Sequence, residues 1–257
     1  LAYARLSLHQ QAVKDFDKAI QLGPDNAGIY RNRSTSHRLL GQHLQAVEDL
    51  NEVIRMDPGH ASDYYNRAGA LANLGQTEQA IPDLDNAIQL GLDNAQVYHN
   101  RGVCYARLGQ MDQAVKDFSR AIQATSDHAF AYCHRGTAYD ILGQHQMAIE
   151  DFYKAIQLDP ENVAAFRGRG LTYAHLEKHQ QAIEDFNRAI LLDPGDPADY
   201  RTIGTALSHL GDMTHAIRSY DKAIQLDPNR APSYRSRGFA FASVGRTKRA
   251  IKDFSKA

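Results

Sequence analysis

The sequence contains few of the features that mark a membrane protein or a disulfide-rich secreted protein. It has only two cysteines, Cys104 and Cys133, in 257 residues. Because two are too few for a disulfide framework, we expect a reducing, cytoplasmic compartment. No apolar run approaches the roughly 18 residues that span a bilayer, and no basic or acidic block marks the chain for nucleic acid or membrane lipid. The formal net charge of -1 is typical of an ordinary soluble protein.

Motifs for catalysis and for cofactor binding are also missing from the sequence. It has no glycine-rich phosphate loop, no serine or cysteine nucleophile motif and no paired-cysteine zinc spacing. His175 and His179 lie four residues apart, a spacing that on one helix could hold a metal ion, but they straddle a predicted turn at Glu177. We therefore expect no enzyme activity, no cofactor and no metal site.

One pattern of 34 residues is repeated along the whole chain without insertion or deletion. An alanine marks every copy: Ala12, Ala46, Ala80, Ala114, Ala148, Ala182, Ala216 and Ala250. Full repeats cover 27–60, 61–94, 95–128, 129–162, 163–196 and 197–230, with partial repeats at 1–26 and 231–257. No linker or change in composition interrupts the series, which predicts a single domain over 1–257.

Each repeat is predicted to form two antiparallel helices. Side chains that can cap the first helix are Asn26, Asn94, Asn162 and Asp196. Glycines that suit the turn between the helices are Gly41, Gly75, Gly109, Gly143, Gly211 and Gly245, while Glu177 replaces one. The second helix ends in Asp-Pro in four copies, where proline cannot continue a helix. A small residue at position eight, such as Gly102, lets the two helices approach closely.

The pattern resembles that of the tetratricopeptide repeat family over the whole chain. The match rests on the aromatic at position four, the small residue at eight, the bulky residue at eleven, alanine at twenty and twenty-seven, the aromatic or leucine at twenty-four and proline at thirty-two. The string Asn100-Arg101-Gly102 is typical of an Asn-Arg-Gly subtype. The resemblance implies an all-α, right-handed superhelical solenoid that acts as a protein-binding scaffold or adaptor.

An arginine occupies position seven of most repeats, on the stripe of the first helix that ought to be buried. An aspartate stands at position twenty-three of the same repeats. The predicted pairs are Arg33–Asp49, Arg67–Asp83, Arg101–Asp117, Arg135–Asp151, Arg169–Asp185 and Arg237–Asp253. The copy that has Ile203 in place of the arginine also has Ser219 in place of the aspartate. Because a buried guanidinium needs a carboxylate to offset its lost hydration, we predict structural ion pairs within or between repeats.

The resemblance further implies that the first helices line a concave groove, with positions two, five, six, nine, twelve and thirteen facing it. Position six reads Asn32, Asn66, Asn100 and then His134. The three asparagines resemble the asparagine ladder of the O-linked N-acetylglucosamine transferase repeats. An amide both donates and accepts hydrogen bonds, so such a row can hold a peptide backbone. Alternatively, the asparagines are solvated residues of the subtype.

Cationic side chains are concentrated at the other groove positions. They are Arg5, Arg31, Arg38, His99, Arg107, Arg167, His175, Arg201, His209 and Arg235, with one acid, Asp140. The chain as a whole is nearly neutral, so this sorting of charge predicts a protein or peptide partner that is acidic or phosphorylated. Cys133 is expected to face the same groove, whereas Cys104 takes a small-residue core position.

Two other functions stay open from the sequence. The chain could be the recognition arm of a larger enzyme, such as a glycosyltransferase, or a nucleic-acid-binding solenoid that uses the same arginines. Few groove aromatics (Tyr65, Phe130 and Phe239) are available for base stacking, which disfavours nucleic acid. Neither end has a polar capping helix, so we expect the protein to continue or its end repeats to self-associate. No membrane partner is expected.

Overall fold

Helices alternate with short turns along the chain. The structure is a computed structural model that describes the backbone of residues 2–23 and 26–257, and the side chains of 8–23 and 26–257. Those residues contain fifteen α-helices and no strand, which confirms the all-α fold class. Arg5, expected to extend the row of cations, lies outside the described side chains. None of the described helices is long and apolar enough to cross a membrane.

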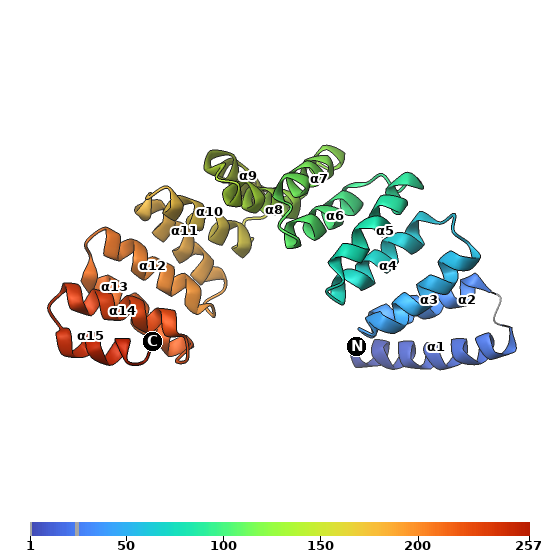
Figure 1. Cartoon of the computed structure of the whole chain (residues 1–257), viewed down its shortest axis with the longest axis horizontal. Helices are drawn as coiled ribbons and strands as arrows, with labels where there is room; N and C mark the ends of the chain where they lie inside the picture. Colours follow the sequence, from blue (N-terminus) through green and yellow to red (C-terminus); the bar gives the residue numbers. More distant parts are fainter. Residues whose placement is uncertain (1, 24–25) are drawn as a thin grey trace. The chain divides into compact units, whose positions relative to one another are not determined.

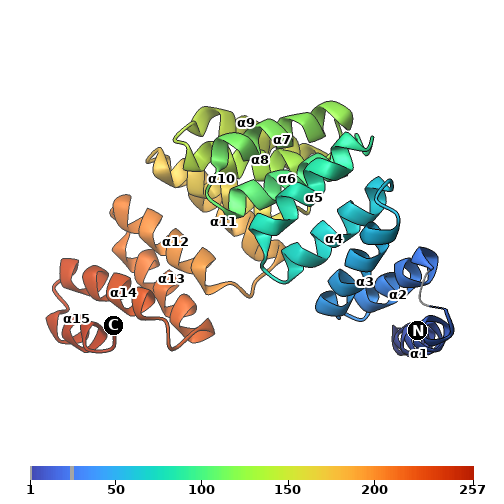
Figure 2. The same ribbon diagram turned by 45° about the vertical axis from the view of Figure 1, so that its right-hand side comes forward.

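The helices fall into two compact units, Leu1–Ser126 and Asp127–Ala257. The first unit contains α1 (Ala2–Leu22), α2 (Ala27–Leu39), α3 (His43–Met56), α4 (Ala61–Asn73), α5 (Thr77–Gln89), α6 (Ala95–Arg107) and α7 (Met111–Ala124). The second contains α8 (Ala129–Ile141), α9 (His145–Leu158), α10 (Val163–His175), α11 (His179–Leu192), α12 (Pro197–His209), α13 (Met213–Leu226), α14 (Ala231–Ser243) and α15 (Thr247–Phe254). Within each unit the helices form successive antiparallel pairs (Figures 1 and 2). The single continuous domain stays a prediction.

The ends of the helices follow the sequence signals closely. The side chains of Asn26, Asn94, Asn162 and Asp196 each accept a hydrogen bond from a backbone N–H in the first turn of the next helix. All six predicted turn glycines have positive φ, between 73° and 82°. Glu177 adopts the same left-handed conformation, with φ of 57°. The predicted helix–turn–helix boundaries are therefore confirmed from residue 26 onward.

The first fragment differs from the other copies, in which a turn separates two helices. Its backbone is one continuous helix, α1, which runs from Ala2 to Leu22. Ser7 stands where six other copies carry the turn glycine and one carries Glu177. A residue with a Cβ enters the left-handed conformation at a cost of about 1–2 kcal/mol, and the backbone adopts that conformation at Glu177 but stays helical at Ser7.

The core lies between the two helices of each pair. The repeated alanine of the second helix is fully buried, as in Ala46, Ala114 and Ala182. At position eight a Cβ on Gly102 would lie 2.8 Å from the ring of Phe118, which is itself 1% exposed. The small residue is therefore required by the close approach of the ring. Within each unit, a second helix also packs on the first helix of the next pair, as α3 does on α4 and α11 on α12.

The two cysteines are both buried and free. Cys104 is 2% exposed, as expected for a small-residue core position. Cys133 was expected to face the groove, but it is only 4% exposed and packs with Phe152, Ala155 and Ala165. The expectation for Cys133 is therefore wrong. The reason is that position five lies at the edge of the core, where a short apolar side chain turns inward.

Candidate peptide-binding face

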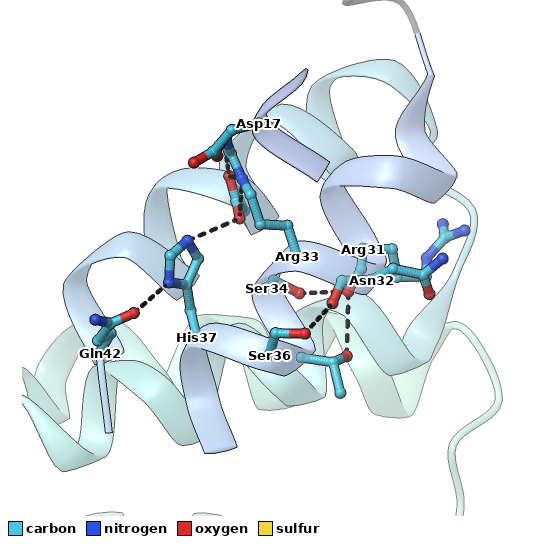
Figure 3. A network of polar contacts seen from close by, with 10 residues as sticks. Asp17, Arg31, Asn32, Arg33, Ser34, Ser36, His37 and Gln42 are labelled. Carbon is cyan, nitrogen blue, oxygen red and sulfur yellow. Dashed lines mark hydrogen bonds and ion pairs between the residues drawn. The ribbon is translucent and has the colours of Figure 1, made fainter. Parts of the chain in front are cut away.

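The arginine at position seven links three helices. In the first copy, the Arg33 guanidinium donates through Nε to Asp49 at 3.0 Å and through Nη2 to the same carboxylate at 2.5 Å. Its Nη1 donates in the opposite direction to Asp17 on α1, at 2.6 Å. Figure 3 shows Arg33 directed at Asp17, with His37 bonded to Gln42 beside it. The arginine therefore joins its own hairpin, α2–α3, to the preceding helix α1.

The same pairing recurs in the other copies. The guanidiniums of Arg67, Arg101, Arg135, Arg169 and Arg237 donate to Asp83, Asp117, Asp151, Asp185 and Asp253 respectively, at 2.6–2.8 Å. In three of them Nη1 also reaches the preceding second helix, at Asn51, Asp85 and Asp221. Each predicted pair is thus in contact within its repeat, and four of the six arginines, Arg33, Arg67, Arg101 and Arg237, also donate across the repeat boundary.

Burial makes these pairs structural rather than ligand-binding. Asp117 is 5% exposed, and the hydrogen bonds that Arg101 donates to its carboxylate raise the pKa of Arg101 above its usual value. The Arg101 guanidinium also lies over the ring of Tyr98, at 5.7 Å from the centroid. Where Ile203 replaces the arginine, its side chain is 6% exposed and fills the same interface. Burial of the carboxylates and pairing of the guanidiniums support the predicted structural role.

Two of the position-five arginines are neutralised by acids that the sequence analysis did not consider. Arg31 donates through Nε and Nη2 to Asp63, at 2.8 Å and 2.7 Å, and Asp63 is fully buried. Arg167 donates to Asp199, at 2.9 Å and 2.8 Å, and Asp199 is 2% exposed. Both aspartates are at position three, outside the predicted groove positions, so the count of one acid does not include them, and Arg31 and Arg167 are not free cations.

A sequence signal for these pairs exists, but it crosses a repeat boundary. The aspartates occupy position three of the repeat that follows each arginine, 32 residues later in both cases. Position three faces the neighbouring first helix, so a carboxylate there meets the position-five side chain of the preceding repeat. Where position five is Tyr65 or His99, the next position three is Val97 or Ala131. Comparison between adjacent copies would have found the pairing.

The remaining position-five arginines lie near the C-terminal end of the second unit. Arg201 on α12 is half-buried, and its Nε makes no hydrogen bond with any described residue. The next position three is Ser233, which is fully buried and likewise has an unpaired hydroxyl among the described residues. Arg235 on α14 is exposed. These two guanidiniums have no carboxylate partner in the part of the chain that the structure describes.

The asparagines of position six are divided between solvent and internal bonds. Asn32 is exposed. The Asn66 amide oxygen accepts from Arg38 Nη1 at 2.5 Å. The Asn100 amide donates to the hydroxyl of Tyr65 at 3.0 Å and accepts from Gln96 at 2.9 Å. Since an amide offers two donors and two acceptor positions, each asparagine keeps capacity for a ligand.

The row of polar side chains at position six is interrupted in the second unit. His134 is half-buried on α8, and burial, with the nearby charge of His128, lowers its pKa. At the next copy a Cβ on Gly168 would overlap the ring of Phe152. Glycine is therefore needed there for packing, and no amide can continue the ladder.

We use the term first-helix face for the surface that the first helices of the repeats form in each unit. These helices are α2, α4 and α6 in the first unit and α8, α10, α12 and α14 in the second. Each unit has a cavity that opens on this face. In the first unit a cavity of about 190 Å³ lies between α4 and α6, lined by Asn73, Asn100 and Arg107 among others. Arg107 also donates to the carbonyl of Ala72 at 3.2 Å. A second cavity, of about 400 Å³, lies between α12 and α14.

The remaining predicted contact residues lie apart from these cavities. His99 stacks at a tilt against Phe118, with ring centroids 5.8 Å apart. His175 and His209 are exposed at the ends of α10 and α12. His209 stacks on His179 at 4.7 Å between centroids, and His175 lies beside Asp140, with Nδ1 and Oδ2 3.1 Å apart.

Comparisons with known proteins agree with the repeat pattern. Tetratricopeptide repeat models match residues 1–61, 64–91, 95–124, 129–162, 163–196 and 200–230. Together these ranges cover most of the chain. No curated protein matches it.

Solved structures of repeat proteins resemble the chain in fold. A tetratricopeptide repeat protein from Parabacteroides merdae has a TM-score of 0.72 and 22% identity, over 91% of this chain and 92% of that one. YrrB, described as a repeat protein with an unusual peptide-binding site, has a TM-score of 0.60 and 23% identity, over 70% and 92%. The Cut9–Hcn1 hetero-tetramer of the APC/C gives 0.68 and 16%, over 96% and 49%.

Proposed function

This chain belongs to the tetratricopeptide repeat family, and on that premise we propose that it is a scaffold that binds an extended, acidic peptide on its first-helix face. The observation that carries the acidic preference is the pair Arg201 and Arg235. These guanidiniums have no carboxylate partner among the described residues, unlike Arg31 and Arg167. An aspartate, glutamate or phosphorylated side chain of the peptide would supply the missing charge.

The cavity between α12 and α14 adds an apolar subsite beside these arginines. Phe239, which is 63% exposed, lines it together with Thr205 and Ser236. Phe239 lies one helical turn after Arg235, and Thr205 lies one turn after Arg201, so each pair shares a helix face. A peptide that places an apolar residue next to an acidic one would contact both groups. The phosphorylated form is favoured where two arginines can share one phosphate.

Considered by itself, the first unit offers contacts to the backbone of a peptide. Asn66 and Asn100 keep donors or acceptors beyond their internal bonds, and Asn100 lines the smaller cavity. Such amides pair with a peptide group whatever side chain it carries. The resemblance to the asparagine ladder of the O-linked N-acetylglucosamine transferase repeats supports this role. The same resemblance supports an alternative form of this function, in which the chain recognises the substrate of a larger enzyme.

The test is a binding titration with labelled peptides that alternate acidic and apolar residues. The double variant with Arg201→Glu and Arg235→Glu, which reverses both charges, is expected to bind the peptides at least about tenfold more weakly. The reason is that a charge-assisted hydrogen bond contributes roughly 1.5–3 kcal/mol. The matched control reverses Arg218 and Lys248, which are exposed on the second helices α13 and α15. It changes net charge equally but leaves the first-helix face intact.

Equal affinity of the two double variants would refute the proposed face, because net charge alone would then explain the binding. The same peptide with amides in place of its carboxylates should bind weakly to the parent chain. If it binds as tightly as the acidic peptide, the acidic preference is wrong while the peptide-binding role stands.

A further inference from the structure

In the second unit, three side chains that can ligate a metal ion lie close together at the C-terminal ends of α8 and α10 and the N-terminal end of α9. Asp140 lies in the last turn of α8, His145 is the first residue of α9, and His175 is the last residue of α10. One ligand atom from each lies within 4.8 Å of the others. His175 and His179 were not expected to hold a metal ion together, whereas the fold places His175 beside Asp140 and His145.

Local geometry sets the first two ligands. The turn between α8 and α9 is closed by Gly143, with φ of 74°, and by a hydrogen bond from Gln144 N–H to the carbonyl of Tyr139 at 2.8 Å. This turn brings His145 Nδ1 to 2.8 Å from Asp140 Oδ1. The Asp140 side chain is only 13% exposed, so its carboxylate is held in place.

The stacking of α10 on α8 supplies the third ligand. His175 Nδ1 lies 3.1 Å from Asp140 Oδ2 and 3.3 Å from Oδ1. Its side chain is 54% exposed, and its ring centroid lies 5.7 Å from that of His145. In a tetrahedral zinc site with bonds of about 2.0–2.1 Å, neighbouring ligand atoms are roughly 3.3 Å apart. Asp140 Oδ1 lies 2.8 Å from His145 Nδ1 and 3.3 Å from His175 Nδ1, within about 0.5 Å of that value, and the exposed His175 can adjust the distance between the two imidazoles.

We propose that Asp140, His145 and His175 form a binding site for a zinc-type divalent cation that joins the α8–α9 hairpin to α10. Two imidazoles and one carboxylate suit zinc, cobalt or nickel, whereas magnesium and calcium prefer oxygen ligands alone. The cation would bind at Nδ1 of each neutral histidine, with the proton on Nε2, and at a carboxylate oxygen of Asp140. Solvent or a group from a partner would complete the coordination.

The chain contains its own control for this site in the next repeat. His179 and His209 hold the same two register positions as His145 and His175, and their rings stack at 4.7 Å. The position that corresponds to Asp140 is Ala174, so the carboxylate is missing. His179 Nδ1 is buried and has no hydrogen-bond partner among the described residues. Loss and gain of a site can therefore be tested in one protein.

The experiment titrates Zn²⁺ into the untagged, chelator-treated chain by calorimetry, and Co²⁺ into the same protein by visible absorption. We expect one equivalent bound per chain. His175→Ala and Asp140→Asn should each weaken Zn²⁺ binding by at least about tenfold, while His209→Ala should leave it unchanged. Far-ultraviolet circular dichroism checks that each variant keeps its helices.

The gain-of-site variant makes the test independent of any loss of folding. Ala174→Asp should add a second equivalent of Zn²⁺ and increase the Co²⁺ absorption accordingly. Absence of binding by the parent chain would overturn the proposal. So would an equal loss of affinity in His175→Ala and His209→Ala, because the twelve histidines of the chain would then be binding metal without a defined site.

Discussion

The pairing of Arg101 with Asp117 offers a demanding test of how this repeat is held together. We predict that Arg101→Ile destabilises the protein strongly, because Asp117 stays buried, at 5% exposure, without its partner. Breaking a buried pair on one side costs on the order of 3–5 kcal/mol. The second partner, Asp85, has a side chain that is 41% exposed, so it regains water and adds little to the loss.

The second change in the test is suggested by the chain itself. The copy with Ile203 and Ser219 shows that the interface can be built without either charge. Adding Asp117→Ser to Arg101→Ile removes the uncompensated carboxylate, so the double variant should recover about 1–3 kcal/mol relative to the single one. The order of stability is then parent, double variant, single variant.

The assay must allow for the behaviour of repeat proteins, whose stability is a sum of local terms. Urea denaturation followed by circular dichroism gives the overall ranking. Hydrogen exchange of the α6 and α7 amides reports the local loss. A single variant that unfolds at the same urea concentration as the parent would refute the reasoning. So would a double variant that is no more stable than the single one.

Three further predictions concern the backbone and the thiols. Glu177→Gly should stabilise the protein by about 0.5–1 kcal/mol, because the left-handed conformation costs a residue with a Cβ roughly 1–2 kcal/mol. Gly143→Glu should destabilise the protein for the same reason, and thermal melts of the two variants measure both effects. Pro82→Lys should raise stability by about 1–3 kcal/mol, since this exposed proline removes a hydrogen bond inside α5; an unchanged urea midpoint would contradict it. Burial raises the pKa of Cys133 to about 11 and also raises the pKa of Cys104. Because the thiolate is the reactive form, alkylation at pH 8 should be about 100-fold slower at Cys133 than at an unperturbed thiol. Fast labelling of Cys133 in the folded chain would contradict this prediction.

Comparison between copies within the chain predicted the buried network well. The joint absence of arginine and aspartate at Ile203 and Ser219 pointed to a pair, and the pair rests on a fixed offset of 16 residues inside one hairpin. The same periodicity located the turns, including the unusual left-handed Glu177. These features depend on local geometry, and the repeats provide several independent copies of the sequence pattern that produces it.

The charges on the first-helix face were harder to predict from the sequence. The partners of Arg31 and Arg167 lie 32 residues away, and the partner of His175 lies 35 residues away, in an adjacent repeat. These contacts depend on how far one hairpin is shifted and rotated on the next. A list of groove positions treats each copy separately, so it counted cations that the neighbouring repeat neutralises.

The sequence by itself determined the order of helices and turns, the helix caps and the ion pairs within hairpins. These features arise from contacts between residues at short sequence separations that recur in the repeats. Only the tertiary structure decided which arginines keep an unpaired charge and which histidine meets Asp140. Those outcomes depend on the packing of one hairpin against the next, where a shift of a single residue brings a different side chain into contact.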